Sequence, residues 1–384
     1  MKALFLVFHG FSDYSGISKK IFDQCEALRC CGVDTQLCYI RIDADGTQRR
    51  LVGNGSKEDF AVDDFGRGLQ AKIAKRLCFN GLTHYIRAQQ IDLLYVRYDH
   101  NANPVLIRWF KQIQRLGVKI ALEIPTYPYD QEFSQASRRA ARLKHLLDRC
   151  FRHRLAQHVD RIVTFSNHAE IFGRPTICIS NGIDFSRIPL KTKVNDTSHE
   201  VNLLGVANIH FWHGFDRVIE GLKNYYATTP TRQVNFHIVG DSSPALIQSY
   251  QEAVSRHNLE QHIFFHGPQS GTALDALFEA CDFGIASLGR HRSGISNLKT
   301  LKNREYAARG ISFVYSEQDD DFDTMPYVLK VPADDAPLDI GKLLHFVDQQ
   351  TLSPTEIRAS IEETLSWKSQ MHYVVQEFHK NKMS

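Results

Sequence analysis

Glu305 is the residue whose type and position most clearly suggest ligand chemistry. It lies near the start of a segment with helical spacing, 298–309, directly after an irregular loop. At the carboxyl edge of a parallel sheet, a carboxylate in this place can accept two hydroxyl hydrogen bonds from a ribose. The alternative is a glutamate on a solvated helix face, which is the commoner situation for an isolated glutamate.

Basic residues near the same predicted edge indicate an anion site. His213 precedes Gly214, which opens a predicted helix at 214–226, and the amides of a helix start can face a phosphate. A nearby anion would favour the protonated form of His213. Lys302 and the basic loop 290–299 could add positive charge, the alternative being solvated loop cations.

Short apolar segments alternate with amphipathic segments along the chain, which predicts βαβ units and parallel sheets. In the first half, the expected strands are 2–8, 35–40, 92–96, 119–123 and 161–165, and the expected helices are 16–31, 66–80, 103–116 and 134–157. In the second half, the expected strands are 201–207, 234–239, 262–265, 282–286 and 311–315, and the expected helices are 214–226, 243–257, 271–280, 298–309, 336–349, 354–363 and 366–380.

The pattern restarts after a polar stretch at 191–199, so we expect two α/β domains, for which 384 residues suffice. We place the first domain at 1–182 and the second at 190–365, with the last segment, 366–384, forming a terminal helix. The turn signal Asn181-Gly-Ile-Asp184 marks the junction. Open parallel sheets bind ligands beyond the carboxyl ends of their strands, which predicts a cleft between two facing sheets.

Five motifs of the second half, in this order and spacing, resemble the retaining GT-B glycosyltransferases of family four. They are Ile179-Ser-Asn-Gly-Ile-Asp184, Leu204-Gly-Val-Ala-Asn-Ile-His-Phe-Trp-His-Gly-Phe-Asp216, Val234-Asn-Phe-His-Ile-Val-Gly-Asp241, Phe264-Phe-His-Gly267 and Lys302-Asn-Arg-Glu-Tyr-Ala-Ala-Arg-Gly310. The resemblance extends over most of the chain. It implies an α/β GT-B fold, with two Rossmann-like parallel-sheet domains facing across a cleft, an acceptor side in the first domain and a nucleotide-sugar donor in the second. It also implies that the terminal helix crosses back to the first domain.

The resemblance assigns a role to each matching position. It places Glu305 on the nucleotide ribose, and puts Asn297 where the family has its first signature glutamate. Asn208 and His213 stand where the family has an arginine and a lysine. Neutral Asn208 cannot stabilise a leaving diphosphate, whereas protonated His213 can. We therefore expect His213 and Asn297 to be catalytic, and the donor-binding residues to be Gly16, Asn208, His213, Gly214, Lys302 and Glu305.

Two loops of the first domain have compositions that suit ligand contact. The family uses a glycine-containing loop after the first strand to approach the donor phosphates, and Gly16 would permit that approach here, although a plain strand–helix turn is the alternative. The segment 123–130 suggests an acceptor-facing wall with Glu123, Tyr127 and Asp130, in which Tyr127 and Tyr129 stack on sugar rings. The alternative is a rigid loop.

The resemblance also implies front-face displacement without a protein nucleophile, in which the leaving phosphate deprotonates the acceptor. It implies no metal, and the acidic run 319–321 is expected to be solvated. We therefore expect no cofactor and no metal ligand, because the nucleotide-diphosphate sugar is a substrate.

The charge is divided unevenly along the chain. Residues 1–182 contain 27 Lys and Arg against 18 Asp and Glu, a net +9, and the remainder carries −6. In the helix expected at 134–157, one arc contains Arg138, Arg139, Arg142, Arg149, Arg152 and His153, and the opposite arc contains Leu143, Leu146, Leu147, Cys150 and Phe151. This pattern predicts an amphipathic helix with a cationic outer face, in which Arg138, Arg142 and Arg149 meet an anionic membrane surface. The alternative is an ordinary solvated face.

Together these features predict a retaining glycosyltransferase that moves a sugar to a glycan or lipid-linked acceptor in polysaccharide biosynthesis. The eight cysteines are scattered without a CxxC pair, and no apolar run approaches a membrane span, so we expect a cytoplasmic protein that is peripheral on the inner face of the membrane. One alternative is a GT-B-fold nucleotide-sugar epimerase. Nucleic-acid binding, suggested only by the basic half, lacks aromatic–basic interleaving, so no nucleic-acid partner is expected.

Overall fold

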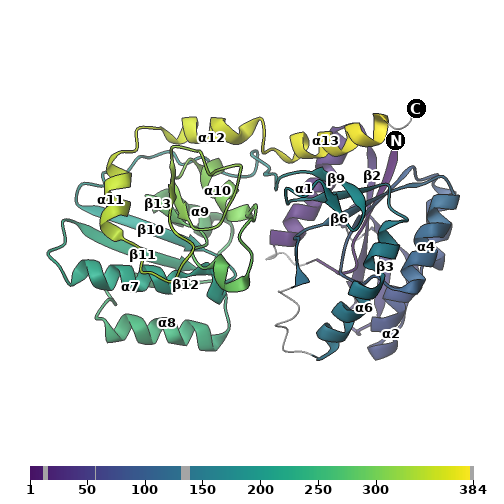
Figure 1. The fold of residues 1–384 in the computed structure, drawn as a ribbon, viewed down its shortest axis with the longest axis horizontal. Helices are drawn as coiled ribbons and strands as arrows, with labels where there is room; N and C mark the ends of the chain where they lie inside the picture. Colours follow the sequence, from purple (N-terminus) through teal and green to yellow (C-terminus); the bar gives the residue numbers. More distant parts are fainter. Residues whose placement is uncertain (12–15, 57, 131–138, 381–384) are drawn as a thin grey trace. The chain divides into compact units, whose positions relative to one another are not determined.

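The computed structural model divides into two compact units, which we describe separately. Unit 1 comprises Met1–Ser180 together with Trp367–Ser384, and unit 2 comprises Asn181–Ser366 (Figure 1). The structure describes residues 1–11, 16–56, 58–130 and 139–380. Residues 183–189, which the sequence-based bounds leave between the two domains, belong to unit 2, as do residues 181–182, which those bounds assign to the first domain.

The described residues of unit 1 form a nine-stranded sheet of order β4-β3-β2-β1-β5-β6-β7-β9-β8. Its strands are β1 (Lys2–Leu6), β2 (Asp34–Ile42), β3 (Gln48–Gly53), β4 (Phe60–Asp64), β5 (Leu93–Arg97), β6 (Lys119–Ile124), β7 (Arg161–Thr164), β8 (Glu170–Ile171) and β9 (Arg174–Cys178). The strands from β2 to β9 in this order are parallel, and β3, β4 and β8 pair antiparallel at the edges. The apolar run 3–8 is buried on both faces, as a central parallel strand requires.

The sequence pattern does not predict β3 and β4, because charged residues interrupt their apolar positions. Arg50 in β3 is fully buried and forms an ion pair with Asp63 of β4 at 2.5 Å. Its guanidinium also donates to the main-chain carbonyls of Cys78 and Lys75 at 2.8 and 2.7 Å. A buried charge that is paired and hydrogen-bonded can replace an apolar side chain, and no local pattern reveals those partners.

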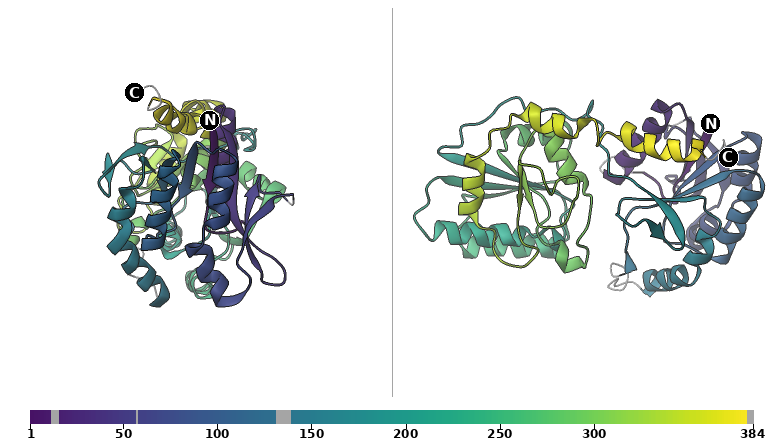
Figure 2. Two further views of the ribbon diagram at one scale, coloured as in Figure 1. Left: turned by 90° about the vertical axis from the view of Figure 1, so that its right-hand side faces the viewer. Right: turned by 45° about the horizontal axis from the view of Figure 1, so that its top comes forward.

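Helices cover both faces of the unit 1 sheet. They are α1 (Gly16–Cys30), α2 (Gly68–Leu77), α3 (Asn80–Ala88), α4 (Pro104–Arg115), α6 (Arg139–Ala156) and α13 (Trp367–Lys380). The helix expected at 66–80 corresponds to α2, and α3, which follows it, is a helix that the sequence pattern does not predict. The yellow α13 runs beside the purple α1 in Figure 1 and in the right-hand view of Figure 2. Its side chains Trp367, Met371 and Val374 are buried in the same cluster as Ile21 and Leu28 of α1.

Unit 2, all of whose residues are described, contains a fully parallel six-stranded sheet of order β12-β11-β10-β13-β14-β15. Its strands are β10 (Glu200–Val206), β11 (Gln233–Val239), β12 (Ile263–Gly267), β13 (Phe283–Ile285), β14 (Phe313–Tyr315) and β15 (Val328–Lys330). The strand order reverses between β10 and β13. In open α/β sheets, the crevice at the carboxyl ends of such a strand pair is the usual ligand site.

The helices of unit 2 end at recognisable signals. They are α7 (Phe215–Tyr226), α8 (Pro244–Arg256), α9 (Gly271–Ala280), α10 (Leu301–Arg309), α11 (Ile340–Asp348) and α12 (Pro354–Glu362), with single 3-10 turns η1 (Phe211–His213) and η2 (Arg290–Ser293). Thr300 caps α10 by accepting the Asn303 amide, and Gly310 ends it at φ 76°. These signals hold the start of α10, which carries Lys302 and Glu305, beside the end of the sheet.

Candidate functional site

The loops after β10 and β13 meet where the strand order reverses. The Leu288 amide donates to the His213 carbonyl at 2.9 Å, and the Gly289 amide donates to the Trp212 carbonyl at 3.2 Å. Gly214 has φ 67°, and a Cβ atom added there would lie 2.8 Å from the Gly289 nitrogen. Only glycine fits this close approach, so the start of α7 is fixed against the loop that leads to Arg290.

His213 is buried in this loop and is uncharged. Its Nδ1 accepts the His210 amide at 2.9 Å, so the ring proton of the neutral imidazole is on Nε2. Burial, and then the positive charges of Lys302 and Arg290, hold the pKa of His213 far below its usual range. Burial and these two cations therefore oppose the cationic form of His213 that is expected beside a diphosphate, and that expectation stays a prediction. The side chain is a neutral hydrogen-bond donor.

Lys302 and Glu317 bring buried, oppositely charged groups to the same end of the sheet. The Lys302 ammonium is buried without a hydrogen-bond partner among the described residues, and both carboxylate oxygens of Glu317 are in the same state. Glu317, which follows β14, is only 2% exposed. Burial lowers the pKa of Lys302 and raises that of Glu317, while the attraction between the two groups opposes both shifts. The two charges attract each other, but neither group forms a hydrogen bond with a described residue.

Other polar atoms around this pair are also unsatisfied. Ser287 Oγ, directly after β13, and Asn297 Oδ1 are buried without a hydrogen-bond partner among the described residues. Arg290 faces the pair electrostatically and stacks its guanidinium over the Trp212 ring at 5.3 Å. Buried polar atoms are almost always paired, so a group of unpaired ones indicates a place where a polar ligand binds.

Arg292, in the same basic loop, is not available for a ligand. It makes a two-pronged ion pair with Asp216 at 2.9 and 2.8 Å and a third contact with Asp335 at 2.7 Å. These contacts hold the η2 turn against α7. Lys302 and Arg290 are the two cations whose positive charge lowers the pKa of His213.

Glu305 and Asn208 are less enclosed than the Lys302 region. Glu305 is partly exposed and forms an i,i+4 ion pair with Arg309 at 3.1 Å. Arg309 also binds Asp275 at 2.8 Å and lies over Phe278 at 3.9 Å. Asn208 is exposed just beyond β10. The ribose role of Glu305 stays a prediction, because its carboxylate has a structural partner but also an accessible face.

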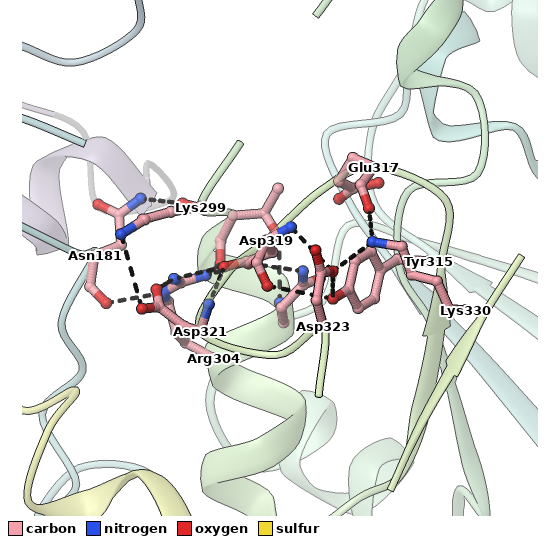
Figure 3. Close-up of polar contacts among 11 residues, drawn as sticks. Asn181, Lys299, Arg304, Tyr315, Glu317, Asp319, Asp321, Asp323 and Lys330 are labelled. Carbon is pink, nitrogen blue, oxygen red and sulfur yellow. Dashed lines mark hydrogen bonds and ion pairs between the residues drawn. The ribbon is translucent and has the colours of Figure 1, made fainter. Parts of the chain in front are cut away.

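A buried ionic network supports the two segments that carry Lys302 and Glu317 (Figure 3). Arg304 and Asp319 are both completely buried and pair at 2.6 and 3.1 Å, and Arg304 also pairs with Asp321. The expectation that 319–321 is a solvated acidic run is wrong for Asp319, because Arg304 neutralises it inside the core. Glu317 joins the network only through its main-chain carbonyl, which accepts from Lys330 (Figure 3).

In unit 1, Glu123 cannot line an acceptor wall, because its side chain is 0% exposed. Its carboxylate accepts from Gln24 and from the Tyr95 hydroxyl, each at 2.7 Å, and pairs with Arg97. Burial alone would raise the pKa of Glu123, but Arg97, then Lys20 and the two hydrogen bonds, hold it below its usual range. The expectation that Glu123 faces an acceptor is therefore wrong, because its carboxylate is buried and fully bonded.

The rest of segment 123–130 is divided between exposed and buried positions. Tyr127 is partly exposed and lies 4.8 Å from the His168 ring, between ring centroids. Tyr129 is buried and donates to Asp148 at 2.8 Å, so it is not free to stack on a sugar. Asp130 pairs with Arg152 at 2.7 and 3.0 Å. Of the expected wall, Tyr127 and Asp130 retain exposed surface.

Gly16, expected to approach the donor phosphates, is exposed at the first position of α1.

Helix α6 exposes a different face from the one that the sequence pattern indicates. Leu143, Leu146 and Leu147, expected to be buried, are 60%, 57% and 46% exposed. Asp148 is fully buried, where it accepts from Tyr129 and Tyr98, and Arg152 turns inward to Asp130. Arg142 and Arg149 are exposed as predicted, and Arg138 lies outside the described residues.

Comparison with known proteins adds to this geometry. No protein-family model matches the sequence, and no curated protein matches it. Sucrose-phosphate synthase from Thermosynechococcus elongatus aligns with a TM-score of 0.65 at 13% identity, covering 100% of this chain and 98% of its own. A glycosyltransferase from Rickettsia africae gives 0.65 at 12%, covering 99% and 98%. Anabaena HepE in complex with UDP gives 0.62 at 14%, covering 99% and 100%.

The chain has the GT-B fold. At these identities the agreement concerns architecture, so the roles of individual residues depend on the geometry above. Within this GT-B chain, the described residues include no group of three or more His, Cys, Asp or Glu side chains that could hold a metal. Every helix in the described ranges is too short or too polar to span a bilayer.

A hollow in unit 2 is separate from the residues described above. This hollow of about 570 Å³ lies at the amino ends of the strands, lined by residues that include Lys191, Asp282 and Ser312. None of the residues predicted to bind the donor lines it. In open α/β sheets, ligands bind at the opposite, carboxyl end of the strands. We therefore place the candidate site at the end that carries Lys302 and not in this hollow.

Sequence reasoning missed Glu317, the residue with the least satisfied buried charge in this region. A signal was available, because Glu317 comes two residues after the apolar run 311–315. A carboxylate placed directly beyond a buried parallel strand lies at the ligand-binding edge of the sheet. The pattern does not show that Glu317 faces Lys302, a residue fifteen positions earlier, since that depends on how α10 packs.

Proposed function

We propose that this protein is a glycosyltransferase that binds a nucleotide-diphosphate sugar at the carboxyl end of the unit 2 sheet. The observation that carries the proposal is the buried Lys302 ammonium, which has no hydrogen-bond partner among the described residues. A buried ammonium that lacks hydrogen bonds is costly, and a diphosphate oxygen would satisfy it. Anabaena HepE, which shares the fold, has been solved with UDP and with UDP-glucose.

Lys302 and Arg290 supply the charge that Asn208 and His213 lack. Both cations act on His213 electrostatically, so all three groups face one region. A diphosphate there would receive charge from Lys302 and Arg290 and a neutral hydrogen bond from His213 Nε2. Preorganised donors of this kind stabilise the charge that develops on a leaving group. We assign the ribose to Glu305 and a sugar hydroxyl to Asn297.

The proposed reaction is retaining and needs no protein nucleophile. The bond between the anomeric carbon and the leaving phosphate oxygen breaks, and the acceptor oxygen bonds to the same face of that carbon. The acceptor proton passes to the leaving phosphate. The protein contributes positioning and the positive charge of Lys302 and Arg290, which together can account for much of a rate enhancement.

A panel of UDP-, ADP-, GDP- and dTDP-sugars tests this function. At least one should raise the melting temperature, because a ligand at about 100 times its Kd stabilises by about 2.7 kcal/mol. The stabilising donor should then yield a glycosylated product with retained configuration when glycan or lipid-linked acceptors are added. A free sugar epimerised without any acceptor would instead indicate the isomerase. If no sugar nucleotide is bound, the donor-site assignment fails.

For the acceptor, we propose a glycan or lipid-linked chain in polysaccharide biosynthesis, reached by a cytoplasmic protein that docks on an anionic membrane. The support is the exposed stripe Leu143, Leu146 and Leu147 on α6, flanked by exposed Arg142 and Arg149. Leucines that insert at the headgroup boundary beside cations that attract anionic lipid are typical of interfacial helices. Exposed apolar patches of this kind mark interaction surfaces.

Helix α2 extends this apolar surface with Leu69, Ile73 and Leu77, which are exposed at i, i+4 and i+8. The Asp99 carboxylate connects the two helices. It pairs with Arg76 of α2 at 3.6 Å and with Lys144 of α6 at 3.0 Å.

Vesicle flotation separates the apolar and the charged contributions. Leu143→Ser with Leu147→Ser should abolish binding to vesicles containing phosphatidylglycerol, and Arg142→Glu with Arg149→Glu should weaken it in a salt-dependent manner. The control is Val194→Ser, which removes an apolar side chain of unit 2 that is even more exposed than these leucines, at 79%. Binding by the leucine variant that equals the parent's would remove the membrane proposal without affecting the donor site.

A further inference from the structure

Two histidine rings meet across the β11–β12 pair, at the edge of the unit 2 sheet. His237 lies in β11 and His266 in the edge strand β12, and Nδ1 of His237 is 3.0 Å from Nε2 of His266. Both side chains are partly exposed. The His237 ring also stacks on Phe264 of β12, with 5.0 Å between the ring centroids, which fixes its orientation. The proposed sugar transfer uses none of these residues.

The pairing of β12 with β11 is irregular at this point. Ile238 is opposite Phe265, and Val239 is opposite Gly267. The register therefore shifts by one residue, and His266 is the additional residue of β12. Bulges are rare between parallel strands, and they often redirect a side chain near a functional site. The irregularity thus coincides with the residue whose ring nitrogen meets β11.

A chain of hydrogen bonds fixes which nitrogen of His237 carries the proton. The Glu200 carboxylate accepts from the Asn235 amide nitrogen at 2.9 Å, and the same nitrogen donates to Asn202 Oδ1 at 3.1 Å. Asn202 Oδ1 also lies 3.3 Å from His237 Nε2, so Nε2 carries the proton and Nδ1 offers a lone pair. Metal-binding histidines are oriented in this way, by an oxygen that accepts from the other ring nitrogen.

Both imidazoles are neutral near pH 7, which is the form that binds metal ions. Burial lowers the pKa of His237, and His266 lowers it further, while Glu200 opposes these effects. Burial also lowers the pKa of His266. Two neutral imidazoles therefore present nitrogens to each other beside a partly exposed sheet edge.

We propose that His237 and His266 are the protein ligands of a divalent transition-metal ion such as Zn²⁺, which links β11 to the edge strand β12. Imidazole nitrogens suit Zn²⁺, Cu²⁺ and Ni²⁺. With metal–nitrogen bonds of about 2.0–2.1 Å, two nitrogens on one ion lie about 2.8–3.0 Å apart at a right angle and about 3.3–3.4 Å apart at the tetrahedral angle. The separation of 3.0 Å between the two rings falls in this range.

The ion takes the place of the hydrogen atom between the two rings. Because His237 Nδ1 has a lone pair, His266 Nε2 donates to it in the absence of metal. When the ion binds, the His266 proton moves through solvent from Nε2 to Nδ1, and both facing nitrogens give a lone pair to the metal. Water fills the remaining positions. Two protein ligands make this site weaker than a structural zinc site with four, and it is separate from the transfer reaction.

Titration of the full-length, EDTA-treated protein with Zn²⁺ in competition with a chromophoric chelator tests the site. His237→Phe keeps a ring against Phe264 but removes both nitrogens, and His266→Gln removes the second ligand. Each should lower the affinity more than the about 10- to 100-fold expected for Asn202→Ala, which removes only the orienting oxygen. The matched control is His345→Gln, which removes an exposed imidazole of α11 and should bind Zn²⁺ as the parent does.

Amide hydrogen exchange gives a second measurement that does not require a variant. Zn²⁺ should slow exchange in β11 and β12 of the parent and leave β14 and β15 unchanged, because an ion bound only by the folded state stabilises the segments that it links.

The outcomes that refute the site are specific. Equal Zn²⁺ affinity of the parent, His237→Phe and His266→Gln would show a hydrogen-bonded pair only. Loss of binding in one of these two variants alone, or in His345→Gln, would place the ion on other ligands. Should His237→Phe not fold, His266→Gln decides, together with the exchange of β11 and β12, and no slowing there refutes the link. The proposed function is independent of these outcomes, because no donor-binding residue belongs to the pair.

Discussion

Two buried glutamates at the ends of parallel strands, Glu123 in unit 1 and Glu317 in unit 2, have opposite surroundings. Glu123 accepts hydrogen bonds from Tyr95 and Gln24 and pairs with Arg97. Glu317 has no hydrogen-bond partner among the described residues. The pKa of Glu123 lies below its usual range, whereas burial raises that of Glu317. Two equally buried carboxylates therefore differ in their hydrogen bonding, since Glu123 is fully bonded and Glu317 is not.

The comparison shows that burial alone does not identify a functional residue. A completely bonded charge stabilises one arrangement of the chain, and removal of any partner breaks it. An incompletely bonded charge costs free energy in the unliganded fold, and such a group persists where function needs it. The sequence singles out Glu123 as a ligand contact, but the structure shows its carboxylate fully bonded inside unit 1. Glu317, which the sequence does not single out, is the carboxylate left without a hydrogen-bond partner among the described residues.

The largest expected effect is a difference in the free energy of unfolding between variants of the two glutamates. Glu123→Gln should cost roughly 3–5 kcal/mol, because it leaves the Arg97 guanidinium buried without its counter-charge. Glu317→Gln should cost less than about 1.5 kcal/mol, since Lys302 can lose its proton when its counter-ion is gone. Amide hydrogen exchange measures both losses, in β5 and β6 for unit 1 and in β13 and β14 for unit 2. Equal losses would show that the two carboxylates do not differ as the hydrogen bonds indicate.

Donor binding should depend on the cations beside Glu317. Lys302→Met should weaken sugar-nucleotide binding by about 10- to 100-fold, because a charge-assisted hydrogen bond contributes about 1.5–3 kcal/mol. His213→Ala should have a smaller effect, since it removes a neutral donor, and Asn208→Ala the smallest of the three. Calorimetric titration of the three variants with the sugar nucleotide measures these losses of affinity. A His213 effect that exceeds that of Lys302 would place the leaving diphosphate nearer to η1.

Glu305 provides an intermediate case, partly exposed and paired with Arg309. If it holds the ribose by two hydroxyl bonds, Glu305→Gln should reduce donor affinity by at least about tenfold. A 2′-deoxyribose donor should bind the parent more weakly and bind the variant with little further loss, because the two changes remove the same interaction. Independent, additive losses would reduce Glu305 to a helix-surface ion pair. Arg309→Gln is the control, since it breaks that pair but leaves the carboxylate.

The smallest effect is the dependence of stability on pH, which should have opposite signs at the two glutamates. The folded-state pKa of Glu123 is depressed, so its contribution is present above the unfolded value of about 4.3 and is lost as the pH falls through the folded value. Burial raises the pKa of Glu317, so stability falls as the pH rises from about 4.3 toward neutral. Urea unfolding at several pH values measures both. Stability of Glu123→Gln should lack the part that is lost at low pH, and stability of Glu317→Gln should lack the part that is lost as the pH rises.

Helix α6 shows why the sequence identified an amphipathic helix but not its outer face. The arcs of cations and leucines are readable at 100° per residue, and the helix forms. Asp148 accepts from Tyr98 and Tyr129, and Arg152 pairs with Asp130, so these charged residues face the sheet. Their partners lie up to 50 residues away in the sequence. A rule that turns leucines inward cannot anticipate such partners.

The sequence by itself determined the alternation of strands and helices, the parallel sheets and the local signals that end helices, because periodicity and capping depend on neighbours within a few residues. It also determined that basic residues and glycines gather at the loops after β10 and β13. Only the tertiary structure decided which charges are satisfied. Arg304 neutralises Asp319, Arg97 neutralises Glu123, and the charged atoms of Glu317 and Lys302 are buried without a hydrogen-bond partner among the described residues. The strength of a buried charge depends on the atoms that surround it in space, and distant segments of the chain bring those atoms together.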